Sequence, residues 1–292
     1  MKRSLGERAF DAFNVLFLCG LSFLFIVPFA HILFSSVSDP MRLMKTPGLI
    51  LWPHGFTLKG YLFALSNRNI YTGYMNTLVY VTAGTALNLL FTSMMAYVLS
   101  RKGVLLNNAM MFLLVFTMFF SGGLVPFYLV VRGIGLYDSR LAMIIPGLVS
   151  VMNMIIMRTS FQGIPESLAE SAKMDGAGNW TILFRIILPV SKALLSVIGL
   201  FYAVGHWNAW FNGSIFLRDR NKFPLQLILR EILVIDDVTA KSDILLDGSE
   251  MDFYRPLVKF ATTMIATLPI LFIYPFIQKN FTQGVMIGSI KG

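Results

Sequence analysis

The chain has 292 residues, of which 56% are hydrophobic and only 13% are charged. Ordinary soluble domains carry about 25% charged residues, so this composition excludes an ordinary soluble protein as well as a disordered, collagen-like or disulfide-rich one. The net charge of +9 would suggest nucleic-acid binding in a soluble domain. In so apolar a chain the excess of lysine and arginine is better explained by contact with anionic lipid surfaces. No nucleic-acid partner is expected.

Six apolar segments predict an all-α polytopic membrane protein with six transmembrane helices. Each segment is long enough for about 20 residues of helix to cross a hydrocarbon core about 30 Å thick. The segments are residues 12–36, 76–100, 108–131, 141–159, 187–211 and 258–277. Pro146 and Pro189 interrupt the fourth and fifth segments, which is tolerated where neighbouring helices cover the freed carbonyl groups.

The first segment follows Met1-Lys2-Arg3, as the apolar part of a cleaved signal peptide would. It stays apolar for more than twenty residues, whereas that part of a signal peptide spans about 7 to 15. We therefore expect a retained first span. The basic N-terminus predicts that residues 1–11 are cytoplasmic, and six spans then place the tail, residues 278–292, on the same side.

Two external loops, residues 37–75 and 212–257, flank a predicted core of five spans over residues 76–277. Both loops are far longer than most connections in compact proteins. The second carries an acidic stretch between Asp236 and Asp252. A flexible solvated segment and a docking surface are both open interpretations of that stretch.

Several kinds of chemistry are missing from the sequence. No P-loop pattern is present, so the chain is not expected to bind ATP by itself. His31, His54 and His206 have no further ligands at metal-binding spacing, and no metal site is assigned. The spans lack both the midplane ionisable residues of a proton-coupled carrier and the side-chain sets of an intramembrane enzyme, so no catalytic residue is expected. An ATP-independent secondary transporter remains the alternative function.

A few neutral polar or amphipathic side chains lie inside the predicted spans, namely Asn88, Asn153, Trp207 and Asn208. They are candidates for lining a hydrated substrate path. Hydrogen bonding between helices is the slightly favoured explanation of such residues, and both interpretations stay open.

The stretch between the fourth and fifth spans has the local signals of two short helices. Pro165 suits the first helical position, and Asp175-Gly176 supplies a stop. Asn179 is expected to cap a second helix, which leads into the fifth span past Pro189. Two short helices joined by a glycine turn predict a compact knob at the cytoplasmic membrane face.

The spacing within this stretch resembles the Glu-Ala-Ala loop of binding-protein-dependent ABC importer permeases. The matching residues are Glu170-Ser171-Ala172, then Gly176 after three residues, then Ile186-x-Leu188-Pro189 after nine more. Ser171 is the one departure, since alanine is usual there, and serine is small enough to preserve a close helix contact. The six-span layout and the tail over 278–292 are similar to the smaller permease of maltose-type carbohydrate importers, so the likeness covers nearly the whole chain.

The resemblance implies a non-catalytic subunit of a bacterial inner-membrane importer, with residues 160–186 as its coupling loop. The residues it assigns to ATPase coupling are Glu170, Ser171, Ala172, Asp175, Gly176, Ala177 and Pro189. It implies as partners a homologous second permease, two ATPase subunits that bind ATP and Mg, and an external solute-binding protein. The implied cargo is a sugar, with an oligosaccharide expected.

The charge of the cargo has one weak signal in the sequence. Arg218, Arg220 and Lys222 gather on the predicted outer side and would suit an acidic oligosaccharide such as a uronate. Phospholipid headgroups and an acidic face of the binding protein account for the same charges.

Overall fold

The structure is a computed structural model that describes residues 4–234, 254–272 and 275. The acidic stretch 236–252 and the tail 278–292 therefore lie outside the described residues. The labelled helices are α1 (Leu5–Ser36), α2 (Pro40–Lys45), α3 (Lys59–Ser66), α4 (Arg68–Ser100), α5 (Asn107–Phe119), α6 (Leu124–Gly133), η1 (Arg140–Met143), η2 (Ile145–Gly147), α7 (Val151–Gln162), α8 (Glu166–Met174), α9 (Asn179–Ile182), η3 (Leu183–Ile187), α10 (Leu188–Val190), α11 (Lys192–Trp207), α12 (Phe211–Phe216), η4 (Arg220–Lys222) and α13 (Leu225–Val234). An unlabelled helix, Tyr254–Phe272, follows.

The chain divides into two compact units, the first within Met1–Ile70 and Glu231–Pro269 and the second within Tyr71–Arg230 and Ile270–Gly292. In the first unit, Ser4 and Glu7 form a capping box at the start of α1. The most apolar window of α1 has none of its residues buried by the protein, as expected for a span whose surroundings are lipid. Near the other end of α1, the Nδ1 atom of His31 accepts the backbone N–H of Ile50 at 3.0 Å.

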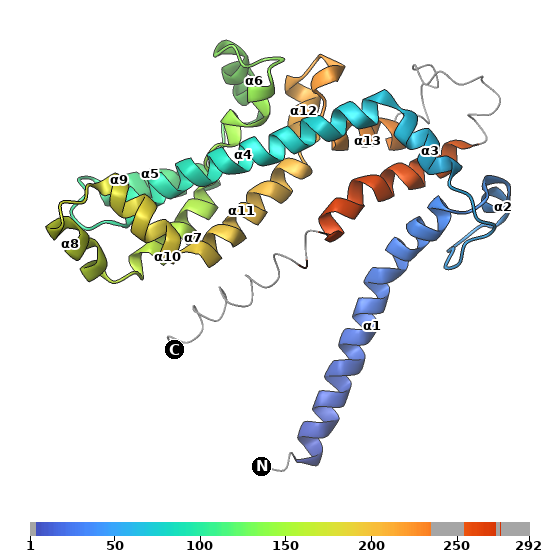
Figure 1. The fold of residues 1–292 in the computed structure, drawn as a ribbon, viewed down its shortest axis with the longest axis horizontal. Helices are drawn as coiled ribbons and strands as arrows, with labels where there is room; N and C mark the ends of the chain where they lie inside the picture. The colour runs from blue at the N-terminus through green and yellow to red at the C-terminus, as the bar shows by residue number, and fades with distance from the viewer. Residues whose placement is uncertain (1–3, 235–253, 273–274, 276–292) are drawn as a thin grey trace. The chain divides into compact units, whose positions relative to one another are not determined.

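The second unit is a helical bundle in which α4, α7 and α11 share one apolar core. Its buried side chains include Tyr97 from α4, Met154 and Phe161 from α7, and Ile198 and Tyr202 from α11. Figure 1 shows α8 and α9 beside the C-terminal end of α4. The bundle therefore carries the predicted coupling loop at one of its ends.

The described helices account for six spans by length and composition. Three single helices are long and apolar enough to cross a membrane, and three bent helix pairs bring the number to six when each pair counts as one span. Helix α4 begins at Arg68 and the sixth span at Tyr254, each earlier than the sequence predicted. Their polar outer turns carry no hydrophobic signal, so periodicity alone did not place them.

The third span is broken, which the sequence analysis did not anticipate. Helix α5 ends at Phe119, α6 begins at Leu124, and the two axes differ by 117°. Gly122-Gly123 interrupts the helix, and Gly123 has φ +84°, a conformation that glycine adopts without steric cost. The fourth span bends by 49° between η2 and α7.

The fifth span bends by 88° between residues 179–190 and 192–207. Pro189 lies just before this bend and has no N–H for the carbonyl four residues earlier, while its ring crowds that carbonyl. The preceding residues, Leu183–Ile187, form a π-turn, which relieves the mismatch by widening the helix. The sequence predicted a bend at Pro189, at the entry to this span, and the structure has a bend two residues later, at Ser191.

Candidate functional site

Helix α8, nine residues long, is the centre of the predicted coupling loop. Ala169 is buried and Ala172 packs against the bundle core, so one face of α8 is anchored by small side chains. Glu170 and Ser171 are exposed. For Glu170, no hydrogen bond or ion pair occurs with any residue that the structure describes. Its carboxylate is therefore available to a partner.

The turn after α8 is a Schellman motif. The N–H of Gly176 donates to the carbonyl of Lys173 and the N–H of Ala177 to that of Ala172, both at 2.9 Å. Gly176 has φ +80°, the left-handed conformation that this helix ending requires and that glycine adopts most readily. Ala172 and Ala177 both pack against the bundle core. The Asp175-Gly176 stop predicted from the sequence is thus a well-defined helix ending.

Two predicted positions at the helix ends shift by one residue. Pro165 is the N-cap of α8, with ψ 130°, rather than its first helical residue. Gly178 is the N-cap of α9, and Asn179 is already helical, so Asn179 does not cap this helix as predicted. The side chain of Asn179 instead accepts the hydroxyl of Tyr97 at 3.5 Å.

Asn88 links three elements of the bundle. Its Nδ2 donates to the carbonyls of Gly147 at 2.8 Å and Leu148 at 2.7 Å, and its Oδ1 lies 2.6 Å from Nε2 of His206. The Asn88 side chain is fully buried. These bonds satisfy backbone groups freed at the break in the fourth span, which is the helix-packing interpretation left open by the sequence.

The other three candidates for the substrate path have different surroundings. Asn153 is buried on α7. Trp207 is buried at the end of α11, with its ring edge-to-face with Tyr74 at 5.8 Å. Asn208 is exposed, and its Nδ2 donates to the carbonyl of Val204 at 3.0 Å. The structure connects Asn88 to α11 through His206, the neighbour of Trp207.

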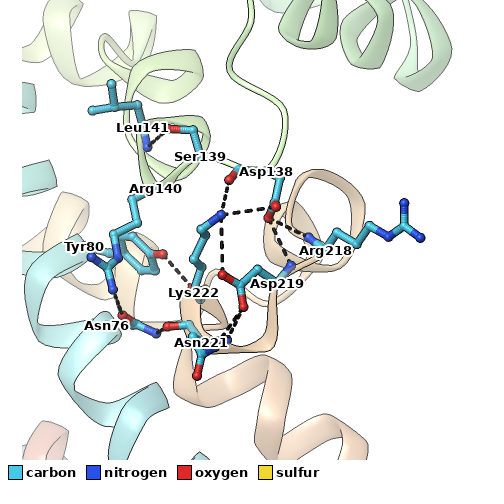
Figure 2. Close-up of polar contacts among 10 residues, drawn as sticks. All are labelled: Asn76, Tyr80, Asp138, Ser139, Arg140, Leu141, Arg218, Asp219, Asn221 and Lys222. Atoms are coloured by element: carbon cyan, nitrogen blue, oxygen red, sulfur yellow. Dashed lines mark hydrogen bonds and ion pairs between the residues drawn. The ribbon is translucent and has the colours of Figure 1, made fainter.

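A polar cluster centred on Asp138 joins the turn after α6 to the loop around η4 (Figure 2). We call it the Asp138 clamp. Oδ1 of Asp138 accepts the backbone N–H groups of Arg218 and Asp219, each at 3.0 Å. Nζ of Lys222 lies 3.2 Å from Oδ2 of Asp138 and 3.6 Å from Oδ2 of Asp219. The two backbone donors, followed by the contact with Lys222, hold the pKa of the Asp138 carboxyl below its usual value.

Helix α4 is connected to the same loop through the backbone. Asn76 donates to the carbonyls of Asn221 at 2.7 Å and Phe223 at 3.1 Å. The hydroxyl of Tyr80 donates to the carbonyl of Lys222 at 2.6 Å. Nη2 of Arg140 donates to Oδ1 of Asn76 at 3.1 Å. The loop around η4 is therefore fixed to residues of α4 that lie 142 to 147 positions earlier in the chain.

A family model for the inner membrane component of binding-protein-dependent transport systems matches residues 88–287. The chain belongs to this permease family. Protein LplC of Bacillus subtilis (strain 168) is 39% identical over 296 aligned residues, covering 100% of this permease and 98% of LplC. The polygalacturonan/rhamnogalacturonan transport system permease protein YtcP of the same organism is 38% identical, covering 99% and 100% of the two chains.

A solved structure is also similar to the permease. It is the crystal structure of a bacterial ABC transporter involved in the import of the acidic polysaccharide alginate. The superposition has a TM-score of 0.87 at 28% identity and covers 96% of this chain and 99% of that chain. The permease therefore has the helical architecture of an ABC importer permease, as the sequence predicted, and like its relatives it is a non-catalytic transport component.

Sequence reasoning missed two groups at or near the predicted coupling loop of the permease. Met174, the last residue of α8, is 89% exposed, which makes it an apolar contact available at the tip of the helix. Arg101 follows α4 and stacks on the ring of Tyr97, with its guanidinium carbon 4.5 Å from the ring centroid. No motif marks either residue, because the relevant neighbours of each come from the folded chain.

The Asp138 clamp of the permease is expected to persist at neutral pH and open only in acid. A lowered carboxyl pKa contributes stability above the ordinary value of about 4, and this stability is lost as the pH falls through the lower folded value. Hydrogen exchange of the Arg218 and Asp219 amides should stay protected down to about pH 5, after correction for intrinsic rates. In Asp138→Ala both amides should exchange roughly tenfold faster, since each loses an ionic acceptor.

Asp138→Asn is the matched variant. It keeps an oxygen acceptor and tolerates the φ of +55° at this position, so intermediate protection is expected. Protection that is lost between pH 7 and 5, or that is unchanged in Asp138→Ala, would contradict the account of the clamp.

Proposed function

We propose that this permease is one of two homologous, non-identical membrane subunits of an ATP-driven importer for acidic oligosaccharides. The observation that carries the proposal is its 38% identity, over nearly its whole length, to a permease named for polygalacturonan and rhamnogalacturonan transport. The structural similarity to an importer of the acidic polysaccharide alginate supports the same class of cargo. ATP and Mg are bound by two partner ATPase subunits, and an external binding protein delivers the sugar.

The basic residues of the outer loop support an acidic cargo only in part. Lys222 is paired with two carboxylates in the Asp138 clamp, so its charge is largely neutralised. Arg218 is exposed, and Figure 2 shows its side chain extending away from the clamp. Arg218 is therefore one residue of this group that we expect to interact with an anionic sugar or with an acidic face of the binding protein.

Orientation and coupling form the second part of the proposal. Both termini and α8 lie in the cytoplasm of a bacterial cell, with α8 docked on an ATPase subunit through Glu170 and the residues around Gly176. ATP-driven closure of the ATPase pair moves the docked helix as a rigid body and shifts the two permeases between inward-open and outward-open states. A free carboxylate on a helix anchored in the bundle core supports this role, because movement of α8 is transmitted directly to α4, α7 and α11.

The four candidate residues for the substrate path have different proposed roles, which follow from their contacts and exposure. Asn88 has both ends of its amide engaged, so we infer that it holds the spans together. Asn208 is exposed at the end of α11, and we assign it to the hydrated path. Asn153 and Trp207 are buried, and we propose that they support the wall of that path.

Uptake by the complete complex in proteoliposomes tests the proposed cargo. Oligogalacturonides of two to four residues should be taken up in an ATP-dependent manner, with at least tenfold preference over neutral oligosaccharides of equal length. Arabino-oligosaccharides serve as the neutral control. Preference for the neutral sugars would reject the acidic cargo. Uptake that persists without the ATPase subunits would instead favour the ATP-independent transporter.

A further inference from the structure

A cavity of about 640 Å³ lies between the C-terminal end of α4 and the coupling helix α8. Met94 and Val98 of α4 and Leu183 of the following π-turn supply apolar walls. Arg101 and Lys173 supply basic groups in the same cavity. The cavity is thus amphipathic and lies at the end of a membrane span.

The charges around the cavity favour an anionic ligand. Three basic side chains and two carboxylates line it. Nζ of Lys102 is paired with Oε2 of Glu166 at 3.1 Å. This ion pair neutralises one positive and one negative charge. Arg101 and Lys173 then outnumber Glu170, so the remaining charge is positive.

Arg101 has hydrogen-bond donors that the described part of the chain leaves unused. Its Nε and Nη2 atoms are buried and have no hydrogen-bond partner among the residues that the structure describes. The stacking on Tyr97 fixes the plane of the guanidinium. A planar, fully charged guanidinium is well suited to bind a phosphate through two hydrogen bonds. Unpaired buried donors are costly, so a shift of the Arg101 side chain that presents them to a phosphate in the cavity is favoured.

The walls of the cavity indicate that its ligand comes from the bilayer. Met94 lies six residues before the end of α4, about 9 Å of helix rise inside the span. Trp180 also lines the cavity, is 62% exposed and stacks on Phe184 at 5.9 Å. Exposed tryptophan is typical of the membrane interface. The apolar end of this cavity lies beside a membrane span and suits an acyl chain better than a polar segment of a soluble protein.

We infer that this cavity binds an anionic phospholipid of the cytoplasmic leaflet. The phosphate lies between Arg101 and Lys173, and an acyl chain follows Met94 and Val98 toward the membrane. Basic pockets between spans on the cytoplasmic side are suited to anionic headgroups. The choice of leaflet rests on the proposed cytoplasmic location of α8, but binding itself depends on neither the cargo nor coupling to ATP.

Lipid retention by the assembled complex, with its second permease and ATPase subunits, tests this inference. The complex is reconstituted in nanodiscs of phosphatidylglycerol and phosphatidylcholine, extracted into detergent without sugar or ATP, and analysed for bound lipid by native mass spectrometry. The wild type should retain phosphatidylglycerol in preference to phosphatidylcholine. Arg101→Gln should lower the affinity for phosphatidylglycerol at least tenfold, and Lys173→Gln about threefold.

Arg185→Gln is the matched control, because Arg185 is an exposed base on the adjacent π-turn and lies outside the cavity. It should retain lipid as the wild type does. Lys173→Gln keeps the inference testable if Arg101→Gln fails to assemble. Equal retention in the wild type and both cavity variants, equal loss in Arg185→Gln, or no phosphatidylglycerol in the assembled complex would overturn it. Displacement of the lipid by glycerol phosphate at equal concentration would also do so, since the site would then recognise a free phosphate ester.

Discussion

Replacing Glu170 by alanine is expected to reduce sugar-stimulated ATP hydrolysis by the complete complex at least tenfold. The Glu170 carboxylate is exposed and makes no ion pair with any described residue, so a partner's basic group can bind it without breaking a contact within the chain. A hydrogen bond to a charged group contributes about 1.5–3 kcal/mol, which corresponds to roughly a 10- to 150-fold change in an equilibrium constant. The measurement is ATP hydrolysis in lipid, with and without binding protein and sugar.

Glu166→Ala is the control for Glu170→Ala, because it removes a carboxylate from the same helix. Glu166 is paired with Lys102, and the two side chains are 53% and 86% exposed. Exposed ion pairs contribute about 0–1 kcal/mol, so stimulation should fall by less than about fivefold. Unchanged stimulation in Glu170→Ala, in a fully assembled complex, would show that Glu170 is not the coupling contact.

The short helix of the proposed coupling loop could be predicted from the sequence because its signals are local. Pro165 and the Asp175-Gly176 pair directly flank the helix they delimit, and both helix ends fall within one residue of the predicted positions. The backbone preferences of proline and glycine act on their own and adjacent residues, so they do not depend on tertiary contacts. Six apolar segments were equally visible, because length and composition alone indicate a span.

The contacts that position the site could not be predicted, because they join residues far apart in sequence. Asn88 bonds the backbone 59 and 60 residues later and the ring of His206 118 residues later. Asp138 meets Arg218 and Asp219 across 80 and 81 residues. An asparagine in a span shows that a polar partner is needed, but periodicity does not say which helix supplies it. The 117° break at Gly122-Gly123 could not be predicted either, since two glycines permit a bend without requiring one.

Replacing Gly176 by valine is expected to leave the permease inserted in the membrane but to lower ATP-driven sugar uptake at least tenfold. A Cβ atom at Gly176 would meet nothing within 4 Å, but the φ of +80° is strained for any L side chain. The strain amounts to about 1–3 kcal/mol and is greatest for β-branched residues. Valine should therefore open the Schellman turn and displace α8 from the position in which we propose that it docks. Uptake and membrane insertion are measured on the same vesicles.

Gly176→Asn separates backbone conformation from side-chain bulk. Asparagine adopts the left-handed conformation more readily than other non-glycine residues, so the helix ending should survive and uptake should fall by less than about threefold. If asparagine is as harmful as valine, the coupling interface itself excludes a side chain here, and the conformational explanation is wrong. Normal uptake in Gly176→Val would contradict this prediction. It would show that coupling between the ATPase and the spans does not need an intact turn after α8.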